Sequence, residues 1–149
     1  MIKEATFEET LELWKELWPD RKSEIEPISA MELKGGINLE ILKNNPTFFI
    51  WYEDNKAVGC NSGFQTGYGR YRSRGIYVKP EYRGKNIAYE LMLATENKAK
   101  KEGCKIFWSI PRKQAIEFYE SFGFKRVSDW FDEGMEFGPN CYVVKRIYI

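Results

Sequence analysis

The chain of 149 residues contains no histidine and only three cysteines, which lie far apart in the sequence. Without histidine, the chain has no Ser–His or Cys–His pair and no histidine general base. An odd number of scattered cysteines fits neither a disulfide framework nor a zinc pattern, so we expect reduced thiols and no metal site. Any chemistry must therefore use carboxylates, tyrosine, serine, lysine, backbone amides or water.

The sequence also lacks a long apolar run and a strong charge of either sign. Its formal net charge is +1, which gives no bulk field to attract nucleic acid or a membrane. No segment is apolar enough to span a bilayer, and the N-terminus shows no charged-then-apolar signal pattern. We therefore expect a cytoplasmic protein, a monomer or homodimer, with no nucleic-acid or membrane partner.

Aromatic side chains are abundant and make up 16% of the residues. Much of this aromatic content must form the core, and aromatic residues beyond that need often line ligand clefts. The length fits a single domain over residues 1–149, large enough to fold around its own hydrophobic core.

The spacing of apolar residues predicts an α/β protein, a mixed sheet with helices on both faces and the element order βααβββαβαββ. Thr6 is a predicted N-cap that forms a capping box with Glu9. Residues 67–75 are expected to be a basic loop or a frayed strand end. The predicted helices span 7–18, 26–43, 87–101 and 113–121, and the strands span 2–6, 47–52, 57–65, 76–78, 105–110, 124–131 and 141–149. The helix over 87–101 joins two parallel strands by a right-handed crossover.

The stretch KPEYRGKNIA, residues 79–88, leads from a strand through a proline turn into a helix. The first amides of a helix lack intrahelical partners and carry the positive end of its dipole. Arg83 and Lys85 add charge, and small residues let a phosphate approach closely. Known phosphate-loop patterns with two or three glycines are absent. Two interpretations stay open from the residues alone: a site for a pyrophosphate-sized anion, or a plain connection with a solvated basic turn.

Two motifs resemble the GNAT N-acetyltransferase superfamily. YVKPEYRGKNIAYELM resembles motif A, [QR]-x-x-G-x-[GA], with Arg83 and Ala88 at its ends and Asn86 in place of the first glycine. Asparagine tolerates the left-handed backbone that glycine usually supplies, and it is also a common N-cap. QAIEFYESFGFKRV, residues 114–127, resembles the family motif A-I-x-F-Y-E-x-x-G-F in full. The resemblance implies a GNAT-like mixed sheet of about seven strands, mostly antiparallel with one splayed parallel pair.

The resemblance further implies an enzyme that binds acetyl-CoA as co-substrate. It would move the acetyl group to a primary amine of a small molecule or peptide, by direct attack in a ternary complex. The turn amides would hold the CoA pyrophosphate, and the pantetheine arm would lie between the splayed strands. The cofactor-binding residues implied are Tyr77, Val78, Arg83, Gly84, Lys85, Asn86, Ile87 and Ala88.

Tyr119 occupies the family's tyrosine position, where the hydroxyl protonates the departing thiolate. The helical pattern by itself also fits a packed aromatic residue that lines the CoA channel. A backbone amide within 76–78 would stabilise the oxyanion. No general base is evident, because RSRGIYV, residues 72–78, contains no acid. Relatives often have asparagine where this chain has Arg112, and both departures leave open a non-catalytic acyl-CoA-binding module.

The sequence does not identify the acceptor. Family resemblance places the acceptor site at the first helices and at the loop between the last two strands. Trp14 and Trp18 fit either core packing or an aromatic cage. Trp130, with the acidic residues around it (Asp129, Asp132 and Glu133), fits a site for a cationic amine or a solvated hairpin tip. GRYRSR, residues 69–74, would suit an acidic substrate as well as nucleic acid.

Overall fold

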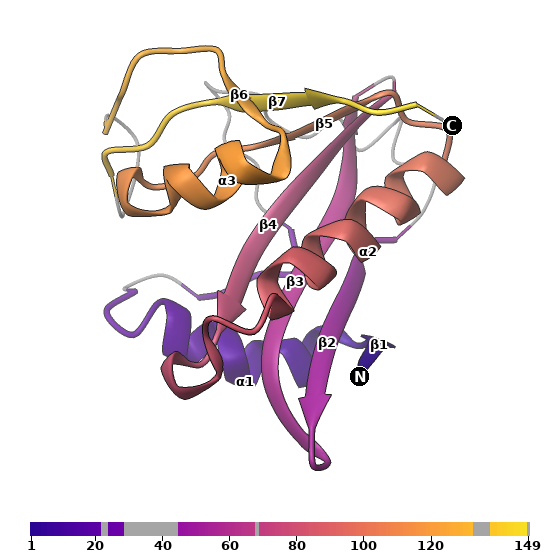
Figure 1. Ribbon diagram of the computed structural model, residues 1–149, viewed down its shortest axis with the longest axis vertical. Helices are drawn as coiled ribbons and strands as arrows, with labels where there is room; N and C mark the ends of the chain where they lie inside the picture. The colour runs from indigo at the N-terminus through magenta and orange to yellow at the C-terminus, as the bar shows by residue number, and fades with distance from the viewer. Residues whose placement is uncertain (22–23, 29–44, 68, 133–137, 149) are drawn as a thin grey trace.

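The computed structural model describes residues 1–21, 24–28, 45–67, 69–132 and 138–148. Within them, seven strands form one sheet in the order β1-β2-β3-β4-β5-β7-β6 (Figure 1). The strands are β1 (Ile2–Ala5), β2 (Thr47–Glu53), β3 (Lys56–Gly67), β4 (Arg70–Val78), β5 (Ile106–Ser109), β6 (Lys125–Arg126) and β7 (Val143–Arg146). The helices are α1 (Phe7–Leu17), α2 (Ile87–Lys101) and α3 (Ile116–Phe122), with 3-10 turns η2 (Pro80–Tyr82) and η3 (Lys113–Ala115).

Every neighbouring pair in the sheet is antiparallel except β4 and β5. These two strands are parallel and are joined by α2, as the crossover prediction required. The predicted fold class is therefore confirmed: a mixed sheet of seven strands, mostly antiparallel, with one parallel pair and helices on both faces.

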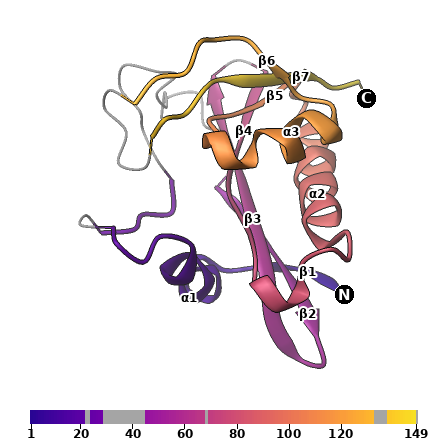
Figure 2. The ribbon, with the colours of Figure 1, turned by 60° about the vertical axis from the view of Figure 1, so that its left-hand side comes forward.

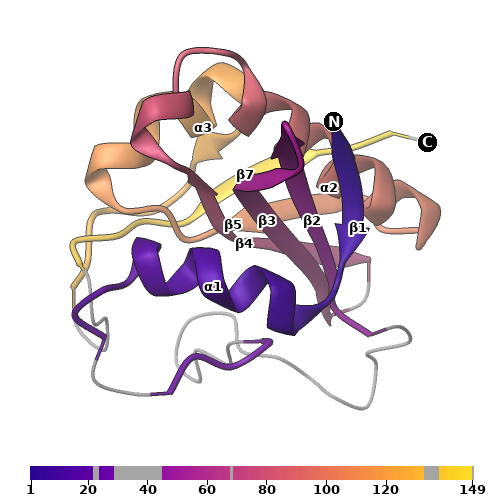
Figure 3. The same ribbon diagram turned by 90° about the horizontal axis from the view of Figure 1, so that it is seen from below.

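The helices form a layer on each side of the sheet. α1 covers one face, and α2 and α3 cover the other (Figures 2 and 3). α1 begins at the predicted capping box, in which Thr6 and Glu9 exchange hydrogen bonds. It buries Leu13 and Trp14 against β2 and β3. On the opposite face, α2 buries its apolar stripe, including Leu91, against the sheet.

A bulge interrupts β4 at Gly75. The pairing register with β3 shifts at this point, and Gly75 adopts a left-handed backbone with φ of 81°. Its carbonyl accepts a 2.9 Å hydrogen bond from Trp14 Nε1. A Cβ on residue 75 would lie 2.2 Å from the same nitrogen, so only glycine fits against this indole. The bulge therefore fixes how α1 sits on the sheet.

The structure corrects several sequence predictions. The sequence predicts a loop or a frayed strand end over 67–75, but residues 70–75 belong to a paired strand, because β4 begins at Arg70. β4 pairs on both sides, and this tertiary pairing outweighs the polar local sequence. The closing strands are shorter than predicted, and β6 contributes only two residues to pairing with β7 at the sheet edge. The helix predicted over 26–43 falls mostly outside the described residues, and 24–28 contains no helix.

Candidate functional site

The parallel strands β4 and β5 are paired over a short stretch only. β4 and β5 pair only from Arg70 with Ile106 to Arg72 with Trp108. Beyond that point β4 continues to Val78, whereas β5 ends at Ser109. The Ser109 hydroxyl donates a 2.7 Å hydrogen bond to the carbonyl of Ser73, which ties the strands together where they part. The last six residues of β4 thus lie along an opening in the sheet.

The predicted anion turn lies directly after this free part of β4. Residues 83–86 are exposed, and α2 starts at Ile87. The first helical hydrogen bond here joins the Glu90 amide to the Asn86 carbonyl at 3.1 Å, so the amides of residues 87–89 precede the hydrogen-bond ladder. A Cβ on Gly84 would have no neighbour within 4 Å. The turn therefore presents amides outside the helical ladder at a positive helix end, with open space beside Gly84.

Asn86 adopts the left-handed backbone expected at the glycine position, with φ of 63° and ψ of 16°. Its side chain makes no capping hydrogen bond, so the N-cap role that asparagine often has is not used. Arg83 Nε donates to the carbonyl of Val78 at 2.9 Å and the guanidinium lies 5.9 Å from the Tyr77 ring centre. This bond holds the arginine against the strand end, beside the turn amides.

Tyr119 lies on α3 and is only 4% exposed. Its ring packs against Phe124 with the ring centres 5.3 Å apart. Burial raises the pKa of its hydroxyl, while a hydrogen bond with Ser109 and the charges of Arg72 and Arg112 act in the opposite direction. The ring is therefore part of the core, and the hydroxyl lies among polar groups at the point where β4 and β5 separate.

Two buried arginines next to this opening are not evident from the sequence. Arg72 and Arg74 are 8% and 4% exposed and project from β4 on the face that α1 covers. The sequence predicts a loop or a frayed strand end for their segment, where arginines would be solvated. The alternation in RYRSR, residues 70–74, carries the period-two pattern of a strand and is the signal that could have found them.

Three carboxylates bear on the search for a general base, and only two of them are suggested by the sequence. Glu81 lies exposed in η2, as expected for a turn residue, whereas Glu53 is the last residue of β2 and accepts a hydrogen bond from Trp51 Nε1 at 2.9 Å. Glu16 on α1 accepts a 3.1 Å hydrogen bond from the Tyr77 hydroxyl. Burial raises the pKa of Tyr77, and its bond to Glu16 adds to the effect. This carboxylate reaches the end of β4 from a helix far away in sequence, which local patterns do not reveal.

In the described part of the acidic aromatic loop, Trp130 already has partners from the chain itself. The Trp130 ring is already covered by the chain's own cations, with Lys113 Nζ at 5.5 Å and the Arg126 guanidinium at 5.2 Å from its centre. Glu133 lies outside the described residues. On α1, Trp14 is fully buried and therefore core, as one of its two interpretations held.

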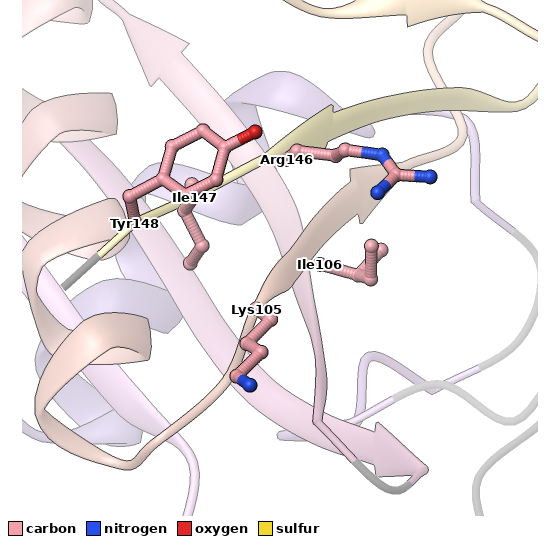
Figure 4. A pocket seen from close by; sticks show the side chains of 5 residues that line it. All are labelled: Lys105, Ile106, Arg146, Ile147 and Tyr148. Atoms are coloured by element: carbon pink, nitrogen blue, oxygen red, sulfur yellow. The ribbon is translucent and has the colours of Figure 1, made fainter.

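A separate pocket lies at the other end of β5. It is lined by Lys105, Ile106, Arg146, Ile147 and Tyr148, where β5 begins and β7 ends (Figure 4). The pocket thus lies at the start of β5, whereas the strands separate toward its end. Across the described part of the chain, no group of three or more Cys, Asp or Glu side chains is arranged to hold a metal ion. Nor does any helix there combine the length and apolar character that crossing a bilayer requires.

Several solved structures share this architecture. A proposed acyl-CoA N-acyltransferase from Klebsiella pneumoniae is 18% identical, with a TM-score of 0.71 over 99% of this chain and 97% of that chain. An aminoglycoside 6′-N-acetyltransferase complexed with coenzyme A is 14% identical, with a TM-score of 0.72 over 100% of this chain and 98% of that chain. A proposed streptothricin acetyltransferase from Bacillus anthracis, in complex with acetyl coenzyme A, is 18% identical, with a TM-score of 0.63 over 71% of this chain and 65% of that chain. The fold is that of N-acyltransferases.

The family follows from a match to the sequence itself. A model described as the acetyltransferase (GNAT) family matches residues 6–124, and the chain belongs to this family. It is accordingly an acyltransferase, as the two motifs implied. Among curated proteins, none matches the sequence significantly.

Proposed function

We propose that the protein transfers an acetyl group from acetyl-CoA to a primary amine of a small molecule or peptide, by direct attack in a ternary complex. The observation that carries this proposal is the opening between β4 and β5, with the anion turn at one end and Tyr119 beside the point of separation. The relatives in complex with coenzyme A and acetyl coenzyme A support the same co-substrate. Three buried free cysteines support a reducing, cytoplasmic location.

The cofactor residues take their roles from this layout. Amides of Gly84, Lys85, Asn86, Ile87 and Ala88 bind the pyrophosphate at the start of α2, and the exposed Lys85 ammonium adds charge. The guanidinium of Arg83, tied to the strand end, borders the same phosphates. The backbone of Tyr77 and Val78, on the free part of β4, pairs with the amides of the pantetheine arm.

The chemical step uses few protein groups. The amine nitrogen bonds to the thioester carbonyl carbon, and a backbone amide within residues 76–78 stabilises the oxyanion that forms. When this intermediate collapses, the C–S bond breaks and the sulfur takes a proton from the Tyr119 hydroxyl. The amine nitrogen loses one proton to water, and a proton from water restores the tyrosine. The products are CoA thiol and an N-acetyl amine, and holding both reactants together supplies much of the rate.

Thiol release from acetyl-CoA with polyamines, aminoglycosides, amino acids and peptides tests this function, with coenzyme A binding measured in parallel by calorimetry. We expect release that depends on an acceptor amine. Binding of coenzyme A without release for any acceptor would indicate an acyl-CoA-binding module instead. Absence of coenzyme A binding would overturn the proposal altogether.

A further inference from the structure

Two arginines lie inside the protein at the opening described above. Arg72 is the last β4 residue paired with β5, opposite Trp108, and Arg74 lies two residues further, where β4 has no β5 partner. Residues two apart in a strand share one face and are separated by about 7 Å. Both guanidiniums therefore border the start of the opening, on the face covered by α1.

Aromatic rings hold both guanidiniums in place. The Arg72 guanidinium lies 5.6 Å from the ring centre of Trp108. The Arg74 guanidinium lies 4.8 Å from that of Trp14 and 5.1 Å from that of Trp18. Arg74 Nη1 also donates a 2.7 Å hydrogen bond to the backbone carbonyl of Glu26. The donors of Arg74 are thus fixed in direction before any ligand arrives, which lowers the entropic cost of binding.

The two charges oppose one another in a buried setting. Burial lowers the pKa of Arg74 to about 9, and repulsion from Arg72 and Arg21 contributes to the same lowering. Burial likewise lowers the pKa of Arg72 to about 10. Both remain protonated near neutral pH, so this part of the site concentrates positive charge in a region of low dielectric. An anion placed there would gain far more than at the surface.

The charge of Arg72 also reaches the reaction centre, because it acts on the Tyr119 hydroxyl. At the rival acceptor surface, Lys113 and Arg126 already occupy the cation–π positions on the Trp130 ring that a cationic amine would take. Both features favour an acceptor with a negative group over a polyamine.

We propose that the acceptor is an amine that carries a compact anionic group, a carboxylate or a phosphate, which Arg74 binds together with Arg72 while the amine faces the thioester. The planar fork of arginine matches the oxygens of either group. This inference rests on the proposed function, because it names the substrate class for the same site.

The test compares matched acceptors. Amino acids, the corresponding carboxamides and the corresponding aminophosphonates are assayed for thiol release at saturating acetyl-CoA and physiological salt. We expect kcat/KM for an anionic acceptor to exceed that for its carboxamide by at least about tenfold. Preference for the carboxylate or for the phosphonate tells which anion the natural acceptor carries. Equal rates for acceptor and carboxamide would overturn the inference.

Variants of Arg74 test whether this residue causes the preference for anionic acceptors. Arg74→Gln is expected to raise KM for the anionic acceptor at least about tenfold and to leave KM for the carboxamide unchanged. Arg74→Lys keeps the charge without the fork and should restore part of the loss. Arg70→Gln, an exposed arginine on the same strand, is the matched control and should retain the wild-type preference. An equal loss for both acceptors in Arg74→Gln would mean a structural role only. If this variant does not fold, the wild-type comparison still decides.

Binding without turnover separates this inference from the proposed function. The Trp14 and Trp18 rings contact Arg74, so tryptophan fluorescence reports occupation of this position. Amino acids and their carboxamides are titrated into the protein loaded with coenzyme A, which has no acetyl group to transfer. Selective binding of the anion without thiol release in the assay would sustain the inference and refute the acetyl transfer. Thiol release with no preference for the anionic acceptor would support the acetyl transfer and refute the inference.

Discussion

Tyr119 combines two properties that a proton donor needs. Its ring is fixed by packing against Phe124, and its hydroxyl lies beside Ser109 where the strands separate. Burial is the largest influence on its pKa and raises it above the ordinary tyrosine value, despite the opposing charges of Arg72 and Arg112. The hydroxyl therefore keeps its proton through neutral and moderately alkaline pH, which the proton-donor role proposed for it requires.

Removing this hydroxyl should slow the chemical step selectively. Tyr119→Phe keeps the packed ring, so we expect kcat to fall by about 10²- to 10⁴-fold while the Kd for coenzyme A is unchanged. In the wild type, kcat should not decline on the alkaline side until the pH exceeds about 10, because the raised pKa keeps the acid form populated. Steady-state kinetics across pH and calorimetry of coenzyme A measure these effects. Unchanged kcat in the variant would show that Tyr119 is only a packing residue.

Asn86 is the second residue whose position bears on the site. Its left-handed backbone shows that the turn retains the geometry of the glycine it replaces, and its carbonyl starts the hydrogen bonding of α2. The prediction from sequence that asparagine tolerates this conformation is confirmed. Capping by its side chain is not observed, because the left-handed residue orients that side chain differently from an extended N-cap.

At the scale of elements, α1 and β4 meet in one close contact between Trp14 and Gly75. Trp14 enters the space above Gly75, and its Nε1 bonds to the Gly75 carbonyl. The same bulge reorients the strand just before Tyr77 and Val78, which we assign to the pantetheine arm. If Tyr77 and Val78 bind the pantetheine arm as proposed, this one backbone irregularity links helix docking to cofactor binding.

A methyl group at this bulge should disrupt the contact. Gly75→Ala places a Cβ against the Trp14 indole and forces alanine into a left-handed backbone, so we expect about 3–5 kcal/mol loss in the free energy of unfolding. Gly103→Ala is the control, since Gly103 has φ of 82° and an added Cβ there would have no neighbour within 4 Å. That control should cost only about 1–2 kcal/mol. Urea denaturation of both variants gives the comparison, and equal losses would contradict the role of Trp14.

Prediction from sequence succeeded for elements whose signal is local. α1 and α2 have regular apolar spacing and clear ends, and the pattern places both nearly at their observed boundaries. Only residues 76–78 of β4 are predicted as strand, because residues 70–75 are mostly polar and owe their strand structure to pairing with β3 and β5. The candidate site divides in the same way: the turn at residues 83–88 is found from its motif, whereas the buried arginines depend on β4.

For the whole molecule, the important feature is a sheet that opens between its two halves. One half contains β1 to β4 and the other contains β5 to β7, and they join through only three paired positions of β4 and β5. A cofactor bound in this opening would contact both halves in the folded state only. Its binding should therefore stabilise the molecule as a unit.

Coenzyme A at about a hundred times its Kd should add about 2.7 kcal/mol to the free energy of unfolding. Thermal denaturation would show this as a rise in Tm of about 2–4 °C for each kcal/mol. Gly84→Glu places bulk and negative charge in the open space before α2 and should lose most of the rise.

Gly103→Glu is the matched control for this variant. Residues 84 and 103 have φ of 83° and 82°, and neither has a neighbour within 4 Å of a Cβ. The backbone strain is therefore the same, but residue 103 follows the opposite end of α2. Equal rises in Tm for the two variants would refute the assigned pyrophosphate position.

The sequence by itself determined the family, the turn at the start of α2, the two main helices and the crossover between parallel strands. These features follow from motifs and from periodicities that extend over a few residues. Only the tertiary structure decided that β4 is a paired strand, that Arg72 and Arg74 are buried beside the opening, and that Trp130 is covered by cations. Burial and charge at these positions arise from segments distant in sequence, and their effects depend on how the chain packs.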